Sequence, residues 1–346
     1  MAVPLHGRPL YSAATLKGTT KLMNARPRIL LTRRWTEAVE RNLAARYEVT
    51  VNEADFPLTA EQLRIAMRDY DALCPTVTDR IDAKVLDVPD RRVQVIGNFG
   101  VGYNHIDVAT ARTLGIRVSN TPDVLTDTTA ELAILLLLMA TRRAGEGERE
   151  LRSGRWTGWR PTHMMGTSLA GKRLGLIGFG RIAQATARKA QAAFGMRIAY
   201  HGRRPAAADV EAQTGAEFIA KVEDLVASSD VISLHCPGGP ETFHLINAAL
   251  LARMQPTAVL INTARGPVVD EAALVAALSE KRIAAAGLDV YEAEPRVHPG
   301  LLQLENVVLL PHLGSATVET RTAMGMRVAA NLDAFFSGQP LPDPVA

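Results

Sequence analysis

A glycine-rich turn is the first feature of the sequence that could bind a ligand. Residues 174–183 read LGLIGFGRIA, an apolar run followed by two glycines and the start of a helical pattern. Glycines between a strand and a helix let backbone N–H groups at the helix N-terminus approach a pyrophosphate. Ala183 replaces the third glycine of GxGxxG, and its small side chain still permits close helix–strand packing. The pattern predicts a dinucleotide site that includes Gly178, Phe179, Gly180, Arg181 and Ile182.

The end of the next predicted strand indicates which dinucleotide is bound. An NAD site normally has an acidic residue about 20 residues beyond the glycines, where it binds the ribose hydroxyls. Here Gly202, Arg203 and Arg204 stand at that point, without a carboxylate. Guanidinium groups can bind a 2′-phosphate, and no acid repels it. The sequence therefore favours NADP(H), with NAD(H) possible; the alternative is that the arginines form only a solvated turn.

Three further motifs follow later predicted strands, where ligands bind in open α/β sheets. They are NTARG at 262–266, GLDVYEAEP at 287–295 and PHLGS at 311–315. Taken singly, Arg265 would be a surface charge, Glu294 a loop charge and His312 a half-buried histidine. Their occurrence in this order at successive strand ends favours a shared catalytic role instead.

These motifs resemble those of the D-isomer-specific 2-hydroxyacid dehydrogenases, whose catalytic set is Arg, Glu and His in this order. The resemblance extends over about residues 26–342. Within the family, the segment NFGVGYNHID at 98–107 and the missing ribose acid are most similar to the glyoxylate and hydroxypyruvate reductases. Two alternatives stay open: a relative acting on a bulkier D-2-hydroxy acid or on phosphoglycerate, and a non-enzymatic NAD(P)-sensing scaffold.

The resemblance implies a role for each residue in the reduction of a small 2-oxo acid. Such a substrate needs a cation for its carboxylate, an acid to protonate the new alkoxide and a hydride donor. Arg265 is expected to bind the carboxylate or polarise the carbonyl, His312 to donate the proton, and Glu294 to hydrogen-bond the other ring nitrogen. Backbone N–H groups of Val101 and Gly102 are expected to bind the substrate carboxylate.

Further cofactor contacts are implied only by the resemblance, because each residue would otherwise pass as a turn or capping residue. Asp289 is expected to accept a hydrogen bond from the nicotinamide carboxamide. The remaining histidines, among them His105 and His244, show no partner pattern and are interpreted as structural or surface residues. The other expected cofactor contacts are Thr129, His235, Cys236, Pro237, Thr242, Thr263, Ala264, His312 and Gly314.

The elements that must position these residues alternate between strands and helices, which is typical of parallel sheets covered on both faces. We therefore expect an α/β protein with two Rossmann-like, doubly wound parallel-sheet domains and a cleft between them. The first series of strands is predicted at 28–32, 48–51, 72–75, 93–96 and 117–119. The second series is predicted at 174–177, 198–201, 231–235, 259–262, 285–289 and 307–310. Helices are predicted at 36–45, 59–69, 128–142, 181–194, 270–280 and 317–336.

The length of 346 residues exceeds what one hydrophobic core usually supports, so two domains are expected. We assign 23–120 plus 312–346 to a discontinuous substrate-binding domain and 121–311 to a dinucleotide-binding domain. Residues 1–22 are interpreted as a disordered extension or an upstream start.

Composition excludes several other classes of protein. A net charge of +3 is too small and too dispersed for a nucleic-acid surface. The longest apolar run, 132–140, is far below the roughly 20 residues that span a bilayer. Cys74 and Cys236 form no metal-ligand pattern and are typical of a reducing compartment, so we expect no metal and a cytoplasmic location. The segment RSGRWTGW at 152–159 suggests an interface, which the resemblance implies is that of a homodimer.

Overall fold

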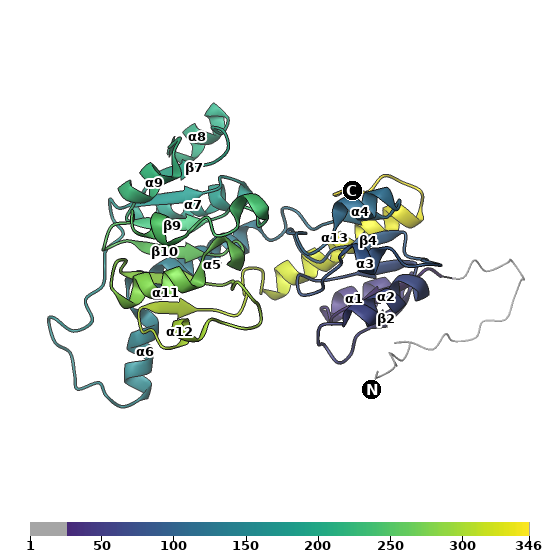
Figure 1. Ribbon diagram of the computed structural model, residues 1–346, viewed down its shortest axis with the longest axis horizontal. Coiled ribbons are helices and arrows are strands. Elements are labelled where there is room, and N and C mark those ends of the chain that lie inside the picture. Colours follow the sequence, from purple (N-terminus) through teal and green to yellow (C-terminus); the bar gives the residue numbers. More distant parts are fainter. Residues whose placement is uncertain (1–25, 346) are drawn as a thin grey trace, which may run out of the picture. The chain divides into compact units, whose positions relative to one another are not determined.

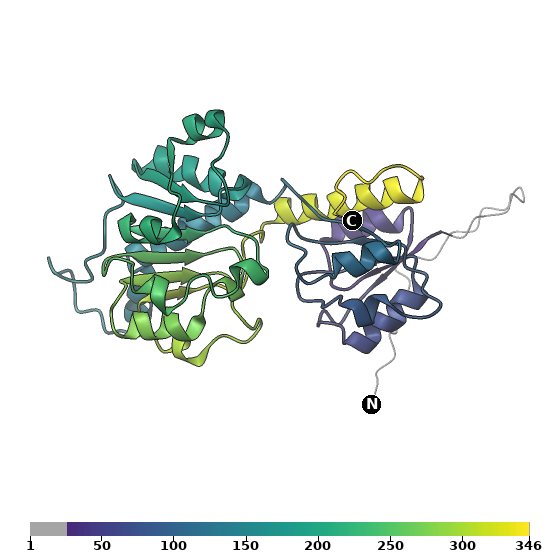
Figure 2. The ribbon, with the colours of Figure 1, turned by 45° about the horizontal axis from the view of Figure 1, so that its top comes forward.

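The computed structural model describes residues 26–345, so the prediction for residues 1–22 lies outside the described part. The described residues divide into two compact units: 26–125 with 316–345, and Thr126–Ser315. Each unit is a parallel sheet with helices on both faces (Figures 1 and 2), which confirms the expected α/β class.

The first unit contains a five-stranded parallel sheet in the order β2-β1-β3-β4-β5. Successive side chains of a strand point to opposite faces, so the neighbours Leu30 and Leu31 belong to different cores. Helices α1 (Glu37–Ala44) and α13 (Val318–Phe336) cover the face of Leu31. Helices α2 (Ala60–Asp69), α3 (Ala83–Leu86) and α4 (Val108–Thr113) cover the face of Leu30. The strands are β1 (Arg28–Leu31), β2 (Glu48–Val51), β3 (Ala72–Cys74), β4 (Val95–Gly97) and β5 (Arg117–Ser119).

The second unit contains a seven-stranded parallel sheet in the order β12-β11-β10-β9-β6-β7-β8. Its strands are β6 (Arg173–Ile177), β7 (Arg197–His201), β8 (Ala216–Phe218), β9 (Val231–Leu234), β10 (Val259–Asn262), β11 (Ala285–Leu288) and β12 (Val307–Leu309). Helices α5 (Thr126–Thr141) and α7 (Arg181–Phe194) pack on one face. The other face is covered by α9 (Val222–Ser228), α10 (Ala248–Leu251), α11 (Glu271–Ser279) and α12 (Pro299–Leu302). The remaining helices are α6 (Ala144–Arg152) and α8 (Ala208–Thr214), with short 3₁₀ turns η1 (Pro240–Thr242) and η2 (Gly266–Val268).

The order of this second sheet reverses at β6, because β7 and β8 extend to one side and β9 to β12 to the other. Ile177 at the end of β6 pairs with Leu234 of β9 and with His201 of β7. Ligands of doubly wound sheets bind outside the carboxyl ends of the strands at such a reversal. The segments that follow β6, β7 and β9 to β12 are therefore the place to look for a site.

Two details differ from the sequence-based expectations. Strand β8 was not predicted, because it is a three-residue edge strand with only one fully buried residue. The boundaries between the units fall after Leu125 and Ser315, a few residues beyond the predicted 120 and 311. His312 therefore belongs to the second unit. Its backbone N–H donates to the carbonyl of Asp289 in the same unit, at 2.9 Å.

Candidate active site

The glycine turn after β6 packs tightly against the segment that follows β9. Gly178 has φ +85°, and a Cβ at this position would lie 2.7 Å from the backbone nitrogen of Cys236. Only glycine accepts both the backbone conformation and this close approach. The Gly178 N–H donates to the His201 carbonyl at 2.9 Å, so the ends of β6, β7 and β9 meet at this turn.

Helix α7 begins at this turn with backbone donors directed toward its N-terminus. Gly180 is the N-cap and supplies no side-chain acceptor to the first turn. A Cβ on Gly180 would meet no heavy atom within 4 Å, so the space beside it is open. Phe179 faces the other way and stacks on Tyr200 of β7, with ring centroids 4.0 Å apart. An uncapped helix start with open space beside it fits a phosphate group.

Two cations follow β7, the strand next to β6. Arg203 and Arg204 come directly after Gly202, and both side chains are exposed. Across the described residues, neither guanidinium is paired with a carboxylate. Two positive charges therefore stand at the strand end where an NAD-specific site would carry an acid.

The segment after β9 supplies neutral groups. Burial lowers the pKa of His235 to about 4, so its ring is neutral at physiological pH, and Nε2 lies 2.9 Å from the Ser233 hydroxyl. Burial also raises the pKa of the Cys236 thiol to about 11. The Thr242 hydroxyl donates to the Pro237 carbonyl at 2.7 Å and closes the intervening loop.

A histidine–carboxylate pair links the segments after β11 and β12. His312 Nδ1 lies 2.9 Å from Glu294 Oε2, while Glu294 Oε1 accepts from the Tyr291 N–H at 3.1 Å. Burial acts to raise the pKa of Glu294. Three groups outweigh it: His312 by its hydrogen bond and charge, the Tyr291 N–H, and the charge of Arg265. The pKa of Glu294 therefore lies below its usual value. Glu294 is therefore ionised at neutral pH beside the ring.

Asp289 holds the turn that carries His312. This carboxylate is 1% exposed and accepts from the Leu313 N–H at 2.6 Å and the Gly314 N–H at 2.9 Å. His312 has φ +56°, a left-handed backbone conformation that residues other than glycine seldom adopt without such support. Thr129 adds a bond to the Gly314 carbonyl at 3.1 Å, and burial raises the pKa of Asp289. This positioning role was missed in the sequence, where Asp289 was expected only to contact the cofactor.

Arg265 follows β10 in a turn that is fixed from both sides. The Asn262 side chain donates to the Arg265 carbonyl and accepts from the Ala264 N–H, each at 3.0 Å. A Cβ on Gly266 would lie 1.8 Å from the carbonyl carbon of Tyr291, so only glycine lets this turn touch the segment that carries Glu294. Burial lowers the pKa of Arg265, and the nearby charge of Glu294 opposes this effect. The Thr263 hydroxyl is buried without a hydrogen-bond partner among the described residues, which leaves it for a ligand.

A second histidine–carboxylate pair was not anticipated. His244 Nε2 lies 2.8 Å from Glu292 Oε1, and the His244 N–H donates to the Pro267 carbonyl at 2.8 Å. Glu292 and Glu271 also accept each other's backbone N–H groups, at 3.4 and 2.8 Å. These bonds join the Arg265 turn to the Glu294 segment. No spacing signal in the sequence pointed to this pair, because its two residues are 48 positions apart.

Val101 and Gly102, the expected carboxylate ligands, lie in the first unit in the turn after β4. No acceptor from the described part of the chain binds their backbone N–H groups. Within residues 26–345 there is no cluster of three or more His, Cys, Asp or Glu side chains that could hold a metal ion. The same residues include no helix that is both long and apolar enough to cross a membrane.

Comparison with known proteins identifies the family. Residues 134–314 match the NAD-binding domain of D-isomer-specific 2-hydroxyacid dehydrogenases. A glyoxylate reductase of Thermococcus onnurineus is 44% identical over 323 residues, which are 92% of this chain and 95% of the relative. A glyoxylate reductase of Aeropyrum pernix is 45% identical over 325 residues, with the same shares covered. The chain belongs to the D-isomer-specific 2-hydroxyacid dehydrogenase family, and it is an NAD(P)-dependent oxidoreductase.

A solved structure agrees with this assignment. The NADPH-dependent glyoxylate/hydroxypyruvate reductase from Sinorhizobium meliloti, in complex with NADP and malonate, has a TM-score of 0.82 and 40% identity. The match covers 93% of this chain and 97% of that one. The relatives together support reduction of a 2-oxo acid as the type of reaction.

Proposed function

We propose that this enzyme reduces glyoxylate or hydroxypyruvate to the D-2-hydroxy acid and prefers NADPH. The observation that carries the proposal is the 2.9 Å bond between His312 and Glu294, in segments next to the turn that carries Arg265. An acid, its carboxylate partner and a cation are what ketone reduction beside a carboxylate requires.

Each side chain has one step in this reaction. Arg265 binds the substrate carboxylate or polarises its ketone oxygen, and the N–H groups of Val101 and Gly102 bind the carboxylate. When bound, the reduced nicotinamide supplies a hydride to the ketone carbon. The electron pair of the C=O bond moves to oxygen, and His312 Nε2 protonates that alkoxide. Glu294 at Nδ1 orients the ring and stabilises its protonated form before transfer.

The cofactor fits the carboxyl ends of the second sheet. Gly178, Phe179, Gly180 and the first turn of α7 would hold the pyrophosphate, and the orphaned Thr263 hydroxyl would bond the nicotinamide half. Asp289 has both oxygens engaged by Leu313 and Gly314, so it would reach the carboxamide through remaining lone pairs. The other expected contacts are Thr129, Arg181, Ile182, Gly202, His235, Cys236, Pro237, Thr242, Ala264, His312 and Gly314.

The choice of NADPH rests on Arg203 and Arg204. Their exposed guanidinium groups pair with no carboxylate within residues 26–345 and can bind a 2′-phosphate with charge-assisted hydrogen bonds. A panel of glyoxylate, hydroxypyruvate, bulkier 2-oxo acids and phosphohydroxypyruvate, each with NADPH and NADH, tests substrate and cofactor together. Absence of turnover with every 2-oxo acid would contradict the proposal and favour a nucleotide-sensing scaffold.

We infer that the enzyme is a cytoplasmic homodimer. Trp159 is 81% exposed and Trp156 50% exposed, in the segment that follows α6. Side chains this apolar are typically covered by a partner, and a second copy of this chain is the partner we propose. The cysteines Cys74 and Cys236 are free and buried, as expected in a reducing compartment. Sedimentation of wild type and Trp159→Ser checks the dimer, which the variant is expected to weaken.

A further inference from the structure

In the turn after β4, three consecutive carbonyl groups, those of Gly100, Val101 and Gly102, accept hydrogen bonds from the protein. The Gly100 carbonyl accepts from Asn98 Nδ2 at 2.9 Å and from the Thr121 N–H at 3.1 Å. The Val101 carbonyl accepts from Asn120 Nδ2 at 2.8 Å, and the Gly102 carbonyl from Asn98 Nδ2 at 3.0 Å.

These bonds decide where the backbone donors of the turn point. In a planar trans peptide the C=O and the following N–H are antiparallel. A carbonyl of Gly100 that faces Asn98 therefore directs the Val101 N–H away from Asn98, and a Val101 carbonyl that faces Asn120 directs the Gly102 N–H away from Asn120. The direction of both proposed carboxylate donors is fixed through the two asparagine amides.

The Asn98 amide can do this in one orientation only. Its nitrogen meets two carbonyl oxygens, so a flipped amide would bring oxygen against oxygen. Its own oxygen, Oδ1, lies 3.0 Å from His105 Nε2. Asn98 is fully buried, so water cannot replace that partner. Because Oδ1 only accepts, His105 must donate from Nε2, and this bond keeps the amide in its working orientation.

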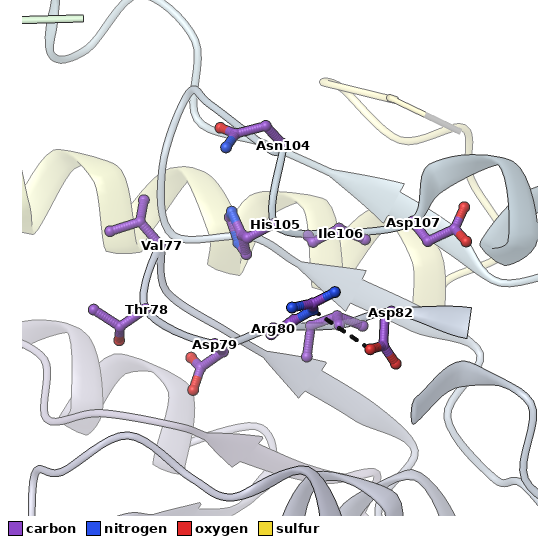
Figure 3. Close-up of a pocket in the computed structure, with 10 residues that line it drawn as sticks. Val77, Thr78, Asp79, Arg80, Asp82, Asn104, His105, Ile106 and Asp107 are labelled. Carbon is purple, nitrogen blue, oxygen red and sulfur yellow. Dashed lines mark ion pairs between the residues drawn. The ribbon is translucent and has the colours of Figure 1, made fainter. Parts of the chain in front are cut away.

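The backbone at His105 is itself hydrogen-bonded to the neighbouring loop. Its carbonyl accepts from the Ile81 N–H at 2.9 Å, and the Asp107 N–H donates to the Ile81 carbonyl at 2.8 Å. His105 lines a hollow of about 410 Å³. Figure 3 shows its side chain among the lining residues, which come from the loops 77–82 and 104–107. These backbone bonds join residue 105 to the neighbouring loop, and the contact of Nε2 with Asn98 Oδ1 at 3.0 Å joins its side chain to the turn after β4.

We propose that His105 is a positioning residue for substrate binding: through Asn98 it aims the Val101 N–H group at the substrate carboxylate. This rests on the proposed function, since it assigns the support of the same carboxylate site. His105 touches neither substrate nor cofactor in this role. Its loss should weaken the binding of a 2-oxo acid far more than it slows the chemical step or weakens the cofactor.

Two amide variants test whether the position of the N–H donor matters, separately from the loss of the imidazole ring. In His105→Gln the amide nitrogen is as far along the side chain as Nε2, so it can still donate to Asn98 Oδ1. In His105→Asn the amide is one bond shorter and matches Nδ1, so it cannot. His105→Ala removes the donor altogether. Thermal unfolding of each variant controls for loss of fold.

The measurements are kcat and KM for glyoxylate with NADPH, the Kd of oxamate for the enzyme–NADPH complex, and the Kd of NADPH. We expect His105→Ala and His105→Asn to raise the glyoxylate KM and the oxamate Kd about tenfold, with kcat and the NADPH Kd nearly unchanged, in line with one unsatisfied buried acceptor. His105→Gln should restore both to within about threefold of wild type.

The outcomes distinguish this proposal from the proposed function. A wild-type enzyme that reduces no 2-oxo acid overturns both. An active wild type with unchanged KM and oxamate Kd in His105→Ala overturns only the role of His105. Equal impairment of the Gln and Asn variants at equal thermal stability also overturns it, because the effect would then not depend on the donor at the Nε2 position.

Discussion

Replacing Glu294 by Gln tests the chemistry of the His312 pair through its pH dependence. The substitution keeps the size of the side chain and an amide oxygen as acceptor but removes the charge that lies 2.9 Å from the ring. Reduction needs the protonated ring, whereas oxidation of the 2-hydroxy acid needs the neutral ring. Without the negative charge the protonated ring is less stable, so the alkaline limb of kcat/KM for reduction should move to lower pH.

The size of this movement follows from the geometry. Hydrogen bonds to charged groups contribute about 1.5–3 kcal/mol, against about 0.5–1.5 kcal/mol for neutral ones. The difference of about 1–1.5 kcal/mol corresponds to about one pH unit. The Glu294 side chain is 27% exposed and its pKa is held below the usual value, so it stays charged throughout the assayed range. The variant should therefore lose little activity on the acidic side and about tenfold above the limb.

The assay is the rate of NADPH oxidation with glyoxylate from pH 5 to 10, together with the reverse reaction. In the reverse direction the limb should also move to lower pH, which extends oxidation into more acidic conditions. Glu292→Gln is the matched control: it removes a charge two residues away, but the partner of that carboxylate is His244. If the profile of Glu294→Gln coincides with that of wild type, Glu294 is not the functional partner of His312.

Three further changes probe the other parts of the site. His312→Ala should lower kcat for glyoxylate reduction by about 10² or more while NADPH binding, measured by fluorescence, stays close to wild type; retained turnover would rule the ring out as the proton donor. The double variant Arg203→Ala, Arg204→Ala should raise the KM for NADPH roughly 10- to 100-fold and leave the KM for NADH nearly constant. An equal rise in KM for both cofactors would contradict the phosphate contact. Gly178→Ala places a Cβ 2.7 Å from the Cys236 nitrogen, on a backbone with φ +85°. It should therefore lower the free energy of unfolding by about 1–3 kcal/mol, measured by thermal unfolding, and weaken the binding of NADPH. An unchanged Tm would contradict the close packing of this turn against Cys236.

The amino-acid sequence alone predicted the sheets and most of their elements. Strands such as Leu174 to Ile177 are apolar on both faces. This pattern can be recognised from consecutive residues alone, and it is typical of a parallel strand that is covered on both sides. The glycines of the turn after β6 were likewise identifiable, because φ +85° at Gly178 limits that position to glycine. The edge strand β8 was not predicted because it has three residues, of which only one is buried, and these carry too little hydrophobic pattern.

Only the tertiary structure decided which side chains meet. The order β12-β11-β10-β9-β6 brings the segments after β10, β11 and β12 to one edge of the sheet, where His312 contacts Glu294. Asp289, which was expected to contact the cofactor, also holds the turn that carries His312. His105 shows the same limit at short range: its partner Asn98 is seven residues away, but both lie in a loop, where sequence spacing does not determine which side chains meet. Hydrogen bonds between loops depend on where the backbone turns, and that is fixed by packing and buried amides, which leave no periodic trace in the sequence.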